Sequence, residues 1–167
     1  MKFNLEVEIK TVATIGQTIL QSKGSHAPML FLFCEQGTAP MLFNDMPEME
    51  KRADLFYRLG QSLHKQSPLG EVNGIIFVSE AWKLKLAKDE KPNIRPSGSP
   101  KRKECLMVVG MRADGTNKTI MLDFDRDQNQ KIINLKETAP DTQPNLLISF
   151  WQGYENWRIP AKKILVS

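Results

Sequence analysis

The chain has few of the residues that build metal centres or disulfide frameworks, with two cysteines and two histidines among 167 residues. Cys34 and Cys105 show no CxxC spacing and each lies among apolar residues, which predicts reduced thiols in a core. His26 and His64 belong to no HxxH or HExxH pattern, so the sequence gives little support for a zinc site. We therefore expect no metal and no other cofactor.

Long hydrophobic runs are also missing. The longest, Met29–Cys34, is far shorter than the ~20 apolar residues that cross a bilayer. Glu6 and Glu8 interrupt the N-terminal stretch, which has no long apolar region of the kind that secretory signals carry. The sequence thus predicts a cytoplasmic protein that does not associate with membranes.

The composition that remains is ordinary for a globular protein. Apolar residues make up 41% and charged residues 25% of the chain, which argues against a disordered, collagen-like or coiled-coil protein. A chain of this length buries roughly 70% of the surface that its unfolded form exposes, so it can fold without disulfides or metal. We expect one domain over residues 1–167.

Three stretches have helical periodicity. The first residues of 4–21 also alternate like a strand, but the helical period lasts four turns and favours a helix. Asp45, followed by Pro47, predicts the capped N-terminus of a second helix that ends near Gln66. Residues 145–158 have the spacing of a C-terminal helix, although the middle of this stretch would also suit a strand, and that choice stays open.

Short apolar or alternating runs predict the strands. Asp114-Gly115 is a hairpin signal between two of these runs. Four runs in series with tight connections favour an antiparallel meander. We therefore predict an α+β fold, in which an antiparallel sheet of five or six strands packs against helices. The predicted strands are 29–34, 39–43, 74–86, 102–111, 118–125 and 131–135.

The positive charge of the chain is concentrated in one connection. Residues 83–103 carry a net charge of +6, whereas the rest of the chain carries −2. The centre of this segment has three prolines and a glycine, so it cannot be a helix interior or a central strand. We expect an extended arm between two strands. Its cations are Lys83, Lys85, Lys88, Lys91, Arg95, Lys101, Arg102 and Lys103.

Two interpretations of the arm stay open. It is either a solvated loop, whose lysines at strand ends discourage edge pairing, or a contact surface for nucleic acid or another polyanion. A proline-rich arm would present cations to a phosphate backbone at little folding cost. No recognition helix, zinc finger or RNP-type aromatic motif accompanies it.

Glu80 is the single polar residue on one face of the predicted strand 74–86. An unpaired carboxylate on an apolar face would be costly, so we expect it to bind a cation. The obvious partners lie on the arm and the returning strand: Arg95, Arg102 and Lys103.

The Glu80 pair has two interpretations. It is either a structural ion pair that anchors the arm, or part of a site in which Glu80, Trp82 and Arg102 hold a ligand. A catalytic acid or base would need a second positioned group. Carboxylates for a metal could come from the neighbouring predicted strands, at Glu104, Asp123 and Asp125.

Residues 123–129 resemble the opening of an EF-hand calcium loop, with side-chain oxygens at alternating positions. The pattern then fails, because the sixth position is Gln128 rather than glycine and the twelfth is Asn134 rather than glutamate. We interpret this stretch as a strand end followed by a polar turn.

Part of the chain has a recognisable signature. The stretch 77–82 contains Ser-Glu-Ala-Trp, and an Arg-Pro-Ser loop and Arg-Lys-Glu then lead into the apolar run 105–109. This resembles a signature of uncharacterised bacterial and phage-related proteins, and it covers about a fifth of the chain. The resemblance implies no reaction, but it groups four residues: Glu80, Trp82, Arg102 and Glu104.

Three functional hypotheses follow. The first is a cytoplasmic binding or accessory protein whose arm, 83–103, contacts an acidic macromolecule, with nucleic acid as one candidate. The second is an enzyme with a cleft around Glu80 and Arg102, such as a metal-assisted hydrolase, with no catalytic residue assigned. The third is a self-associating module that forms a homo-oligomer through exposed apolar residues of the C-terminal segment, such as Trp157. The candidate binding residues are Glu80, Trp82, Lys91, Arg95, Lys101, Arg102, Lys103 and Glu104.

Overall fold

The computed structural model describes residues 2–84, 102–140 and 144–155. In chain order, the elements are α1 (Leu5–Lys23), β1 (Met29–Cys34), β2 (Gly37–Leu42), α2 (Met49–Lys65), β3 (Val72–Leu84), β4 (Arg102–Arg112), β5 (Asn117–Arg126), β6 (Ile132–Thr138) and α3 (Asn145–Glu155).

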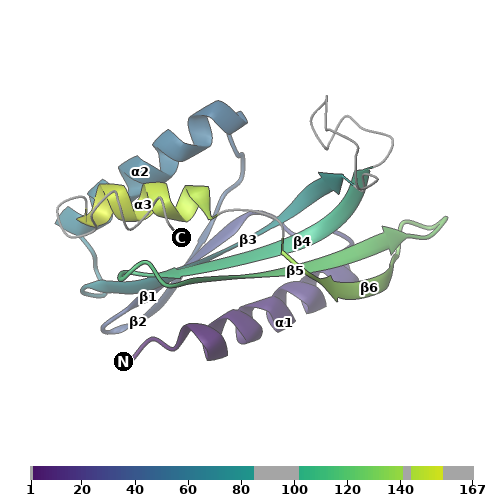
Figure 1. Cartoon of the computed structure of the whole chain (residues 1–167), viewed down its shortest axis with the longest axis horizontal. Coiled ribbons are helices and arrows are strands. Elements are labelled where there is room, and N and C mark those ends of the chain that lie inside the picture. Colours follow the sequence, from purple (N-terminus) through teal and green to yellow (C-terminus); the bar gives the residue numbers. More distant parts are fainter. Residues whose placement is uncertain (1, 85–101, 141–143, 156–167) are drawn as a thin grey trace.

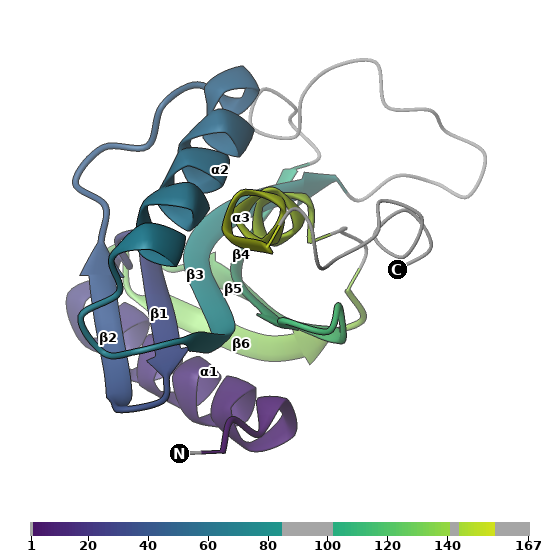
Figure 2. The same ribbon diagram turned by 90° about the vertical axis from the view of Figure 1, so that its left-hand side faces the viewer.

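The six strands form one antiparallel sheet in the order β2-β1-β3-β4-β5-β6. From β3 to β6 the sheet is a meander, whereas the β1–β2 hairpin is joined to it through α2. Helix α1 lies on one face of the sheet, and α2 and α3 lie on the other (Figures 1 and 2). The predicted α+β fold is confirmed, with helices on both faces.

Each face of the sheet has its own apolar core. Even-numbered residues of the central strands, such as Ile76 and Leu106, pack against α1. Odd-numbered residues, such as Ile75 and Val109, pack against the α2–α3 pair. This alternation explains why the first half of β3 is apolar on both sides.

Helix α1 confirms the choice of helix over strand for the N-terminal stretch. The side chain of Asn4 accepts a hydrogen bond from the Val7 N–H (3.2 Å), which caps the first turn. Gly24 ends the helix in the left-handed conformation, with φ at 76°, and its N–H donates to the Leu20 carbonyl. The apolar stripe of α1 is buried against the sheet, including Ile9 and Val12.

Helix α2 begins later than predicted, and Asp45 does not cap it. The helix starts at Met49, and its N-cap, Glu48, is extended and makes no capping hydrogen bond through its side chain. Met46 precedes a proline, which disfavours helical backbone there, and Met46 packs against the core beneath α2. The segment before the helix is therefore held extended.

Strand β6 runs further than predicted, to Thr138 instead of residue 135. The pairing with β5 shifts register between Asp123 and Asp125, and Asn134 on β6 has a positive φ of 54°. This irregularity lets β6 continue pairing, so that Thr138 lies opposite Met121.

Residues 145–155 form α3, which decides the open choice between helix and strand; the last residues of 145–158, Trp157 among them, lie outside the described residues. Helices α2 and α3 pack very closely. A Cβ atom built on Gly153 would lie 1.9 Å from the Tyr57 carbonyl oxygen, and one on Gly60 would lie 2.1 Å from the Phe150 carbonyl oxygen. Only glycine at these two positions allows this approach.

Aromatic side chains attach the α2–α3 pair to the sheet. Phe56 on α2 meets Phe77 on β3 edge to face, with ring centroids 5.2 Å apart. On α3, the Trp151 Nε1–H donates to the Met111 carbonyl (3.3 Å), and the Tyr154 hydroxyl accepts from the Val72 N–H (2.9 Å). Trp151 and Tyr154 are both buried, so these hydrogen bonds fix where α3 lies on the sheet.

We predict that Tyr154→Phe costs about 1–2 kcal/mol at neutral pH, because it leaves the buried Val72 N–H without its acceptor. Burial raises the pKa of Tyr154, so the folded state favours the neutral phenol. The contribution of the Tyr154 hydroxyl to stability is therefore present below pH 10 and is lost as the pH rises above it. Urea unfolding from pH 7 to 11 should show the difference between the native protein and the variant narrowing above pH 10. A constant difference would contradict this role.

None of the helices within the described ranges is long and apolar enough to cross a membrane.

Candidate functional site

The candidate residues that the structure describes lie at one end of the β3–β4 hairpin. Trp82 pairs with Glu104, and Glu80 pairs with Leu106, in an antiparallel register that continues to Leu84 and Arg102. The predicted pairing of these two strands is therefore confirmed. Glu80, Trp82 and Glu104 share the face on which α1 lies, because residues opposite one another in the ladder point to the same side.

Glu80 binds an arginine, but that arginine is Arg126 on β5. The distance from Arg126 Nη2 to Glu80 Oε1 is 3.2 Å. Arg126 Nε also donates to both carboxylate oxygens of Glu104, at 3.0 and 3.2 Å. The Arg126 guanidinium thus lies between two carboxylates on the two neighbouring strands, with its carbon 5.4 Å from the centroid of the Phe124 ring.

The network also holds the end of α1. Arg126 Nη1 donates to the Gly24 carbonyl (2.8 Å), and the backbone N–H of His26 donates to Glu80 Oε2 (3.0 Å). His26 is buried, and its Nδ1 lies 2.7 Å from the Ala27 carbonyl oxygen. Both oxygens of Glu80 therefore have protein partners, and the segment that they anchor is the loop after α1.

The prediction that Lys103 pairs with Glu80 is wrong. Lys103 lies on the opposite face of β4, where it forms an ion pair with Asp125. The physical reason is the alternation of side chains along a strand: Lys103 is adjacent to Glu104 in sequence and therefore points the other way. The other two predicted partners lie in parts of the chain that the structure does not describe, namely Arg95 and the side chain of Arg102.

A second polar cluster occupies the opposite face at the same end of the sheet. Lys83 Nζ lies 2.9 Å from both Asp123 Oδ1 and Thr138 Oγ1. Lys103 pairs with Asp125, which also accepts from the Asn134 side-chain amide (3.0 Å). Two lysines of the predicted basic arm are thus neutralised by aspartates within the sheet. One of these aspartates, Asp123, is almost fully buried, at 5% exposure.

Sequence reasoning missed Arg126, which lay in the calcium-like stretch. The signal that could have found it is the hairpin at Asp114-Gly115, which sets the β4–β5 register and places Glu104 opposite Phe124. Arg126 is then the diagonal neighbour of Glu104 on the same face, within reach of a long side chain. The register had to be known before this pair could be proposed.

The calcium-like stretch is a strand end followed by a polar turn, as predicted. Strand β5 ends at Arg126, and Asp127 Oδ1 accepts from the backbone N–H groups of Asn129 and Lys131, at 2.8 and 2.9 Å. Among the described residues, no three histidine, cysteine, aspartate or glutamate side chains gather in a way that could hold a metal ion.

Trp82 is the residue of this group that solvent reaches most readily, with 37% of its surface exposed. The remaining candidates, Lys91, Arg95 and Lys101, lie in the segment 85–101, outside the described residues. The structure therefore brings together Glu80, Glu104 and Arg126 on one face, and separates Lys103 from them.

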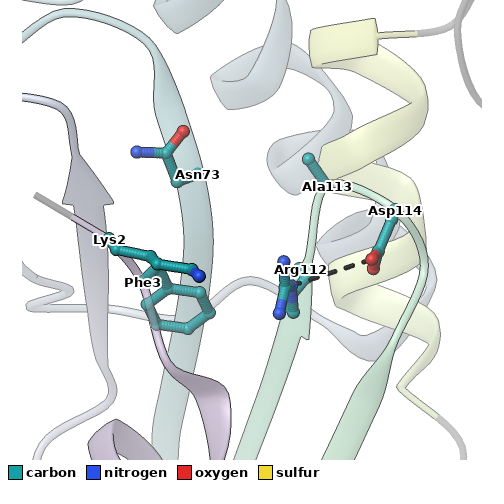
Figure 3. A pocket seen from close by; sticks show the side chains of 6 residues that line it. All are labelled: Lys2, Phe3, Asn73, Arg112, Ala113 and Asp114. Atoms are coloured by element: carbon teal, nitrogen blue, oxygen red, sulfur yellow. Dashed lines mark ion pairs between the residues drawn. The ribbon is translucent and has the colours of Figure 1, made fainter.

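The described residues also line an open depression of about 360 Å³ at the opposite end of β3 and β4 (Figure 3). It lies where the residues before α1 meet the start of β3 and the β4–β5 turn. None of the candidate residues within the described ranges lines it. The lining residues are Lys2, Phe3, Asn73, Arg112, Ala113 and Asp114.

Comparison with known proteins gives a family. A family model described as bacteriophage lambda protein ea47 matches residues 2–166. The chain belongs to this family. The phage relationship that the Ser-Glu-Ala-Trp signature predicted is thereby confirmed. No curated protein and no solved structure matches the chain, so the ea47 family membership brings no activity with it.

Proposed function

We propose that this member of the ea47 family is a non-enzymatic, cytoplasmic accessory protein that binds nucleic acid through the basic segment 85–102. The observation that supports this most directly is the β3–β4 register. Because Leu84 pairs with Arg102, the residues that flank the segment meet at one end of the β3–β4 hairpin. The cations of the segment are therefore attached to one end of the sheet.

The charge balance at this end of the sheet supports the proposal. Lys83 and Lys103 are neutralised by Asp123 and Asp125, so they are not available to a partner. Residues 85–102 still hold six cations and two anions, a net charge of +4. The two polar clusters at the sheet end together hold four carboxylates and three cations, a net charge of −1. This charge offsets only a small part of the positive charge of the segment.

The function of the sheet end is then to support the segment. Arg126 joins three strands to the loop after α1, and the two lysine–aspartate pairs join the hairpin to β5. A phosphate backbone bound by Lys and Arg releases condensed counterions, so affinity depends steeply on salt. Sequence is not read by such contacts, and we expect little base specificity.

We predict a salt-dependent affinity for mixed-sequence nucleic acid that falls when the segment is neutralised. The variant Lys85→Gln/Lys88→Gln/Lys91→Gln/Arg95→Gln removes four cations. If all four contact phosphates, the slope of log Kd against log salt should shrink by about 3–4, since each phosphate contact contributes ~0.7–0.9. Fluorescence anisotropy with a labelled oligonucleotide, single-stranded and duplex, at several salt concentrations measures this slope.

The matched control neutralises four exposed lysines elsewhere: Lys10, Lys23, Lys51 and Lys131. This control changes the net charge by the same amount but leaves the segment intact. The slope of log Kd against log salt should therefore stay close to that of the native protein. Absence of binding at low salt would reject the proposal. An equal loss in the control would show a non-specific effect of net charge and would also reject it.

A further inference from the structure

The open depression at the other end of β3 and β4 gathers hydrogen-bond donors that lack close partners in the described part of the chain. The Arg112 side chain is 43% exposed, and its one described contact is to Asp114, at 3.8 Å. That distance is too long for a hydrogen bond. No ion pair or hydrogen bond within the described residues engages the Lys2 ammonium or the Asn73 side-chain amide.

The backbone around the depression is held in place. Phe3 is 7% exposed, and its ring lies against Gly74, where an added Cβ atom would come within 2.1 Å of it. This contact fixes the residues before α1 beside the start of β3. On the opposite wall, the Ala113 N–H donates to the Asn73 carbonyl (3.3 Å), which closes the end of the β3–β4 ladder.

The β4–β5 turn positions Asp114, the single acid among the described residues that line the depression. Asp114 Oδ1 accepts from the Thr116 N–H (2.9 Å), which orients its carboxylate within the turn. Figure 3 shows the Lys2 side chain reaching from the segment before α1 toward Arg112, with Asp114 on the far side of Arg112. Among the described lining residues, two cations and one anion leave a net charge of +1.

We infer that this depression binds a small ligand through an oxyanion group, a phosphate monoester or a carboxylate. Arg112 supplies a planar fork of donors that matches such a group, and Lys2 and Asn73 supply further donors from the opposite side. An oxyanion bound between Lys2 and Arg112 would reduce the repulsion between these two cations. It would also accept hydrogen bonds from side-chain N–H groups that have no close acceptor among the described residues. Phe3 forms an apolar wall for the rest of the ligand.

This site is independent of the proposed nucleic-acid segment. Arg112 and Arg102 stand at opposite ends of β4, ten residues apart, which is roughly 33 Å along an extended strand. A small ligand cannot reach both. A variant that neutralises the segment 85–95 should therefore bind the small oxyanion as the native protein does, so the two proposals fail separately.

The test is a titration of the 15N-labelled full chain with inorganic phosphate, acetate and glycerol 3-phosphate at constant ionic strength. We expect saturable shifts of the Ala113 and Gly115 amide signals, with phosphate bound more tightly than acetate because it carries more charge. Arg112→Gln should weaken binding by about fivefold or more. Arg58→Gln, at an exposed arginine on α2, should leave it unchanged.

Lys2→Gln provides a second variant, since Lys2 is exposed and its replacement does not affect the β4–β5 turn. Shifts that do not saturate, or that are the same in Arg112→Gln and the native protein, would overturn the inference. Vesicles containing phosphatidic acid present the same group on a membrane. Binding to these vesicles without binding to soluble glycerol 3-phosphate would also overturn it.

Discussion

Gly153→Ala should destabilise the protein by roughly 2–4 kcal/mol, although alanine is the better helix former by about 1 kcal/mol. The added Cβ atom would lie 1.9 Å from the Tyr57 carbonyl oxygen and 2.8 Å from its carbonyl carbon. These are backbone atoms, so no side-chain rotation can relieve the overlap. Helices α2 and α3 must move apart, which opens the core around Trp151 and Tyr154. Urea unfolding at pH 7 measures the loss, and Tm should fall by about 5–15 °C.

The matched control is Gly16→Ala on α1. Its added Cβ atom would meet a side chain rather than backbone, with Leu106 Cδ2 at 3.1 Å. The gain in helix propensity then offsets the crowding, and we expect a change within about 1 kcal/mol in either direction. Gly60→Ala should behave like Gly153→Ala, because its Cβ atom would meet the Phe150 carbonyl at 2.1 Å. If Gly153→Ala were as stable as Gly16→Ala, the close packing of α2 on α3 would be disproved.

Arg126→Met should lower the free energy of unfolding by about 3 kcal/mol. Methionine keeps much of the volume but removes the cation between Glu80 and Glu104, whose side chains are 30% and 22% exposed. Breaking one partner of a largely buried ion pair leaves an uncompensated charge, which costs about 3–5 kcal/mol when burial is complete. Here two carboxylates lose the same partner, and the Gly24 carbonyl loses its donor.

A triple variant tests the electrostatic explanation. Adding Glu80→Gln and Glu104→Gln to Arg126→Met removes both uncompensated charges, so it should recover more than half of the loss. Arg58→Met breaks the exposed pair with Asp54 and should change the stability by less than about 0.5 kcal/mol. Chemical denaturation gives all the values. If the triple variant were as unstable as Arg126→Met, lost packing rather than charge would be the cause.

The Arg126 network gives Glu80 a structural role that differs from the predicted one. The strand pattern correctly marked Glu80 as a carboxylate that must find a cation, and an arginine pairs with it. The expected partners were near in sequence, on the arm and the returning strand, whereas Arg126 lies 46 residues away on β5. Glu80 consequently anchors the loop after α1, through the His26 N–H, and not the arm.

The elements themselves could largely be predicted. The strand Met29–Cys34 has the predicted bounds, and α1 differs from the prediction by two residues or fewer at each end. Local rules decide such elements, since the period of apolar residues and the conformations that glycine and proline favour act within a few residues. The prediction was wrong at Asp45, where packing of Met46 against the core outweighed a plausible cap.

The sequence by itself determined the α+β class, the β3–β4 hairpin and the concentration of charge in the segment 83–103, because periodicity and composition are local properties. Only the tertiary structure decided which charges meet. It placed Lys83 and Lys103 with β5 aspartates, gave Arg126 two carboxylates, and brought Lys2 and Arg112 to the same depression. The physical reason is that ion pairs depend on strand register and on the packing of α1, and a shift of one residue would move every partner to the other face.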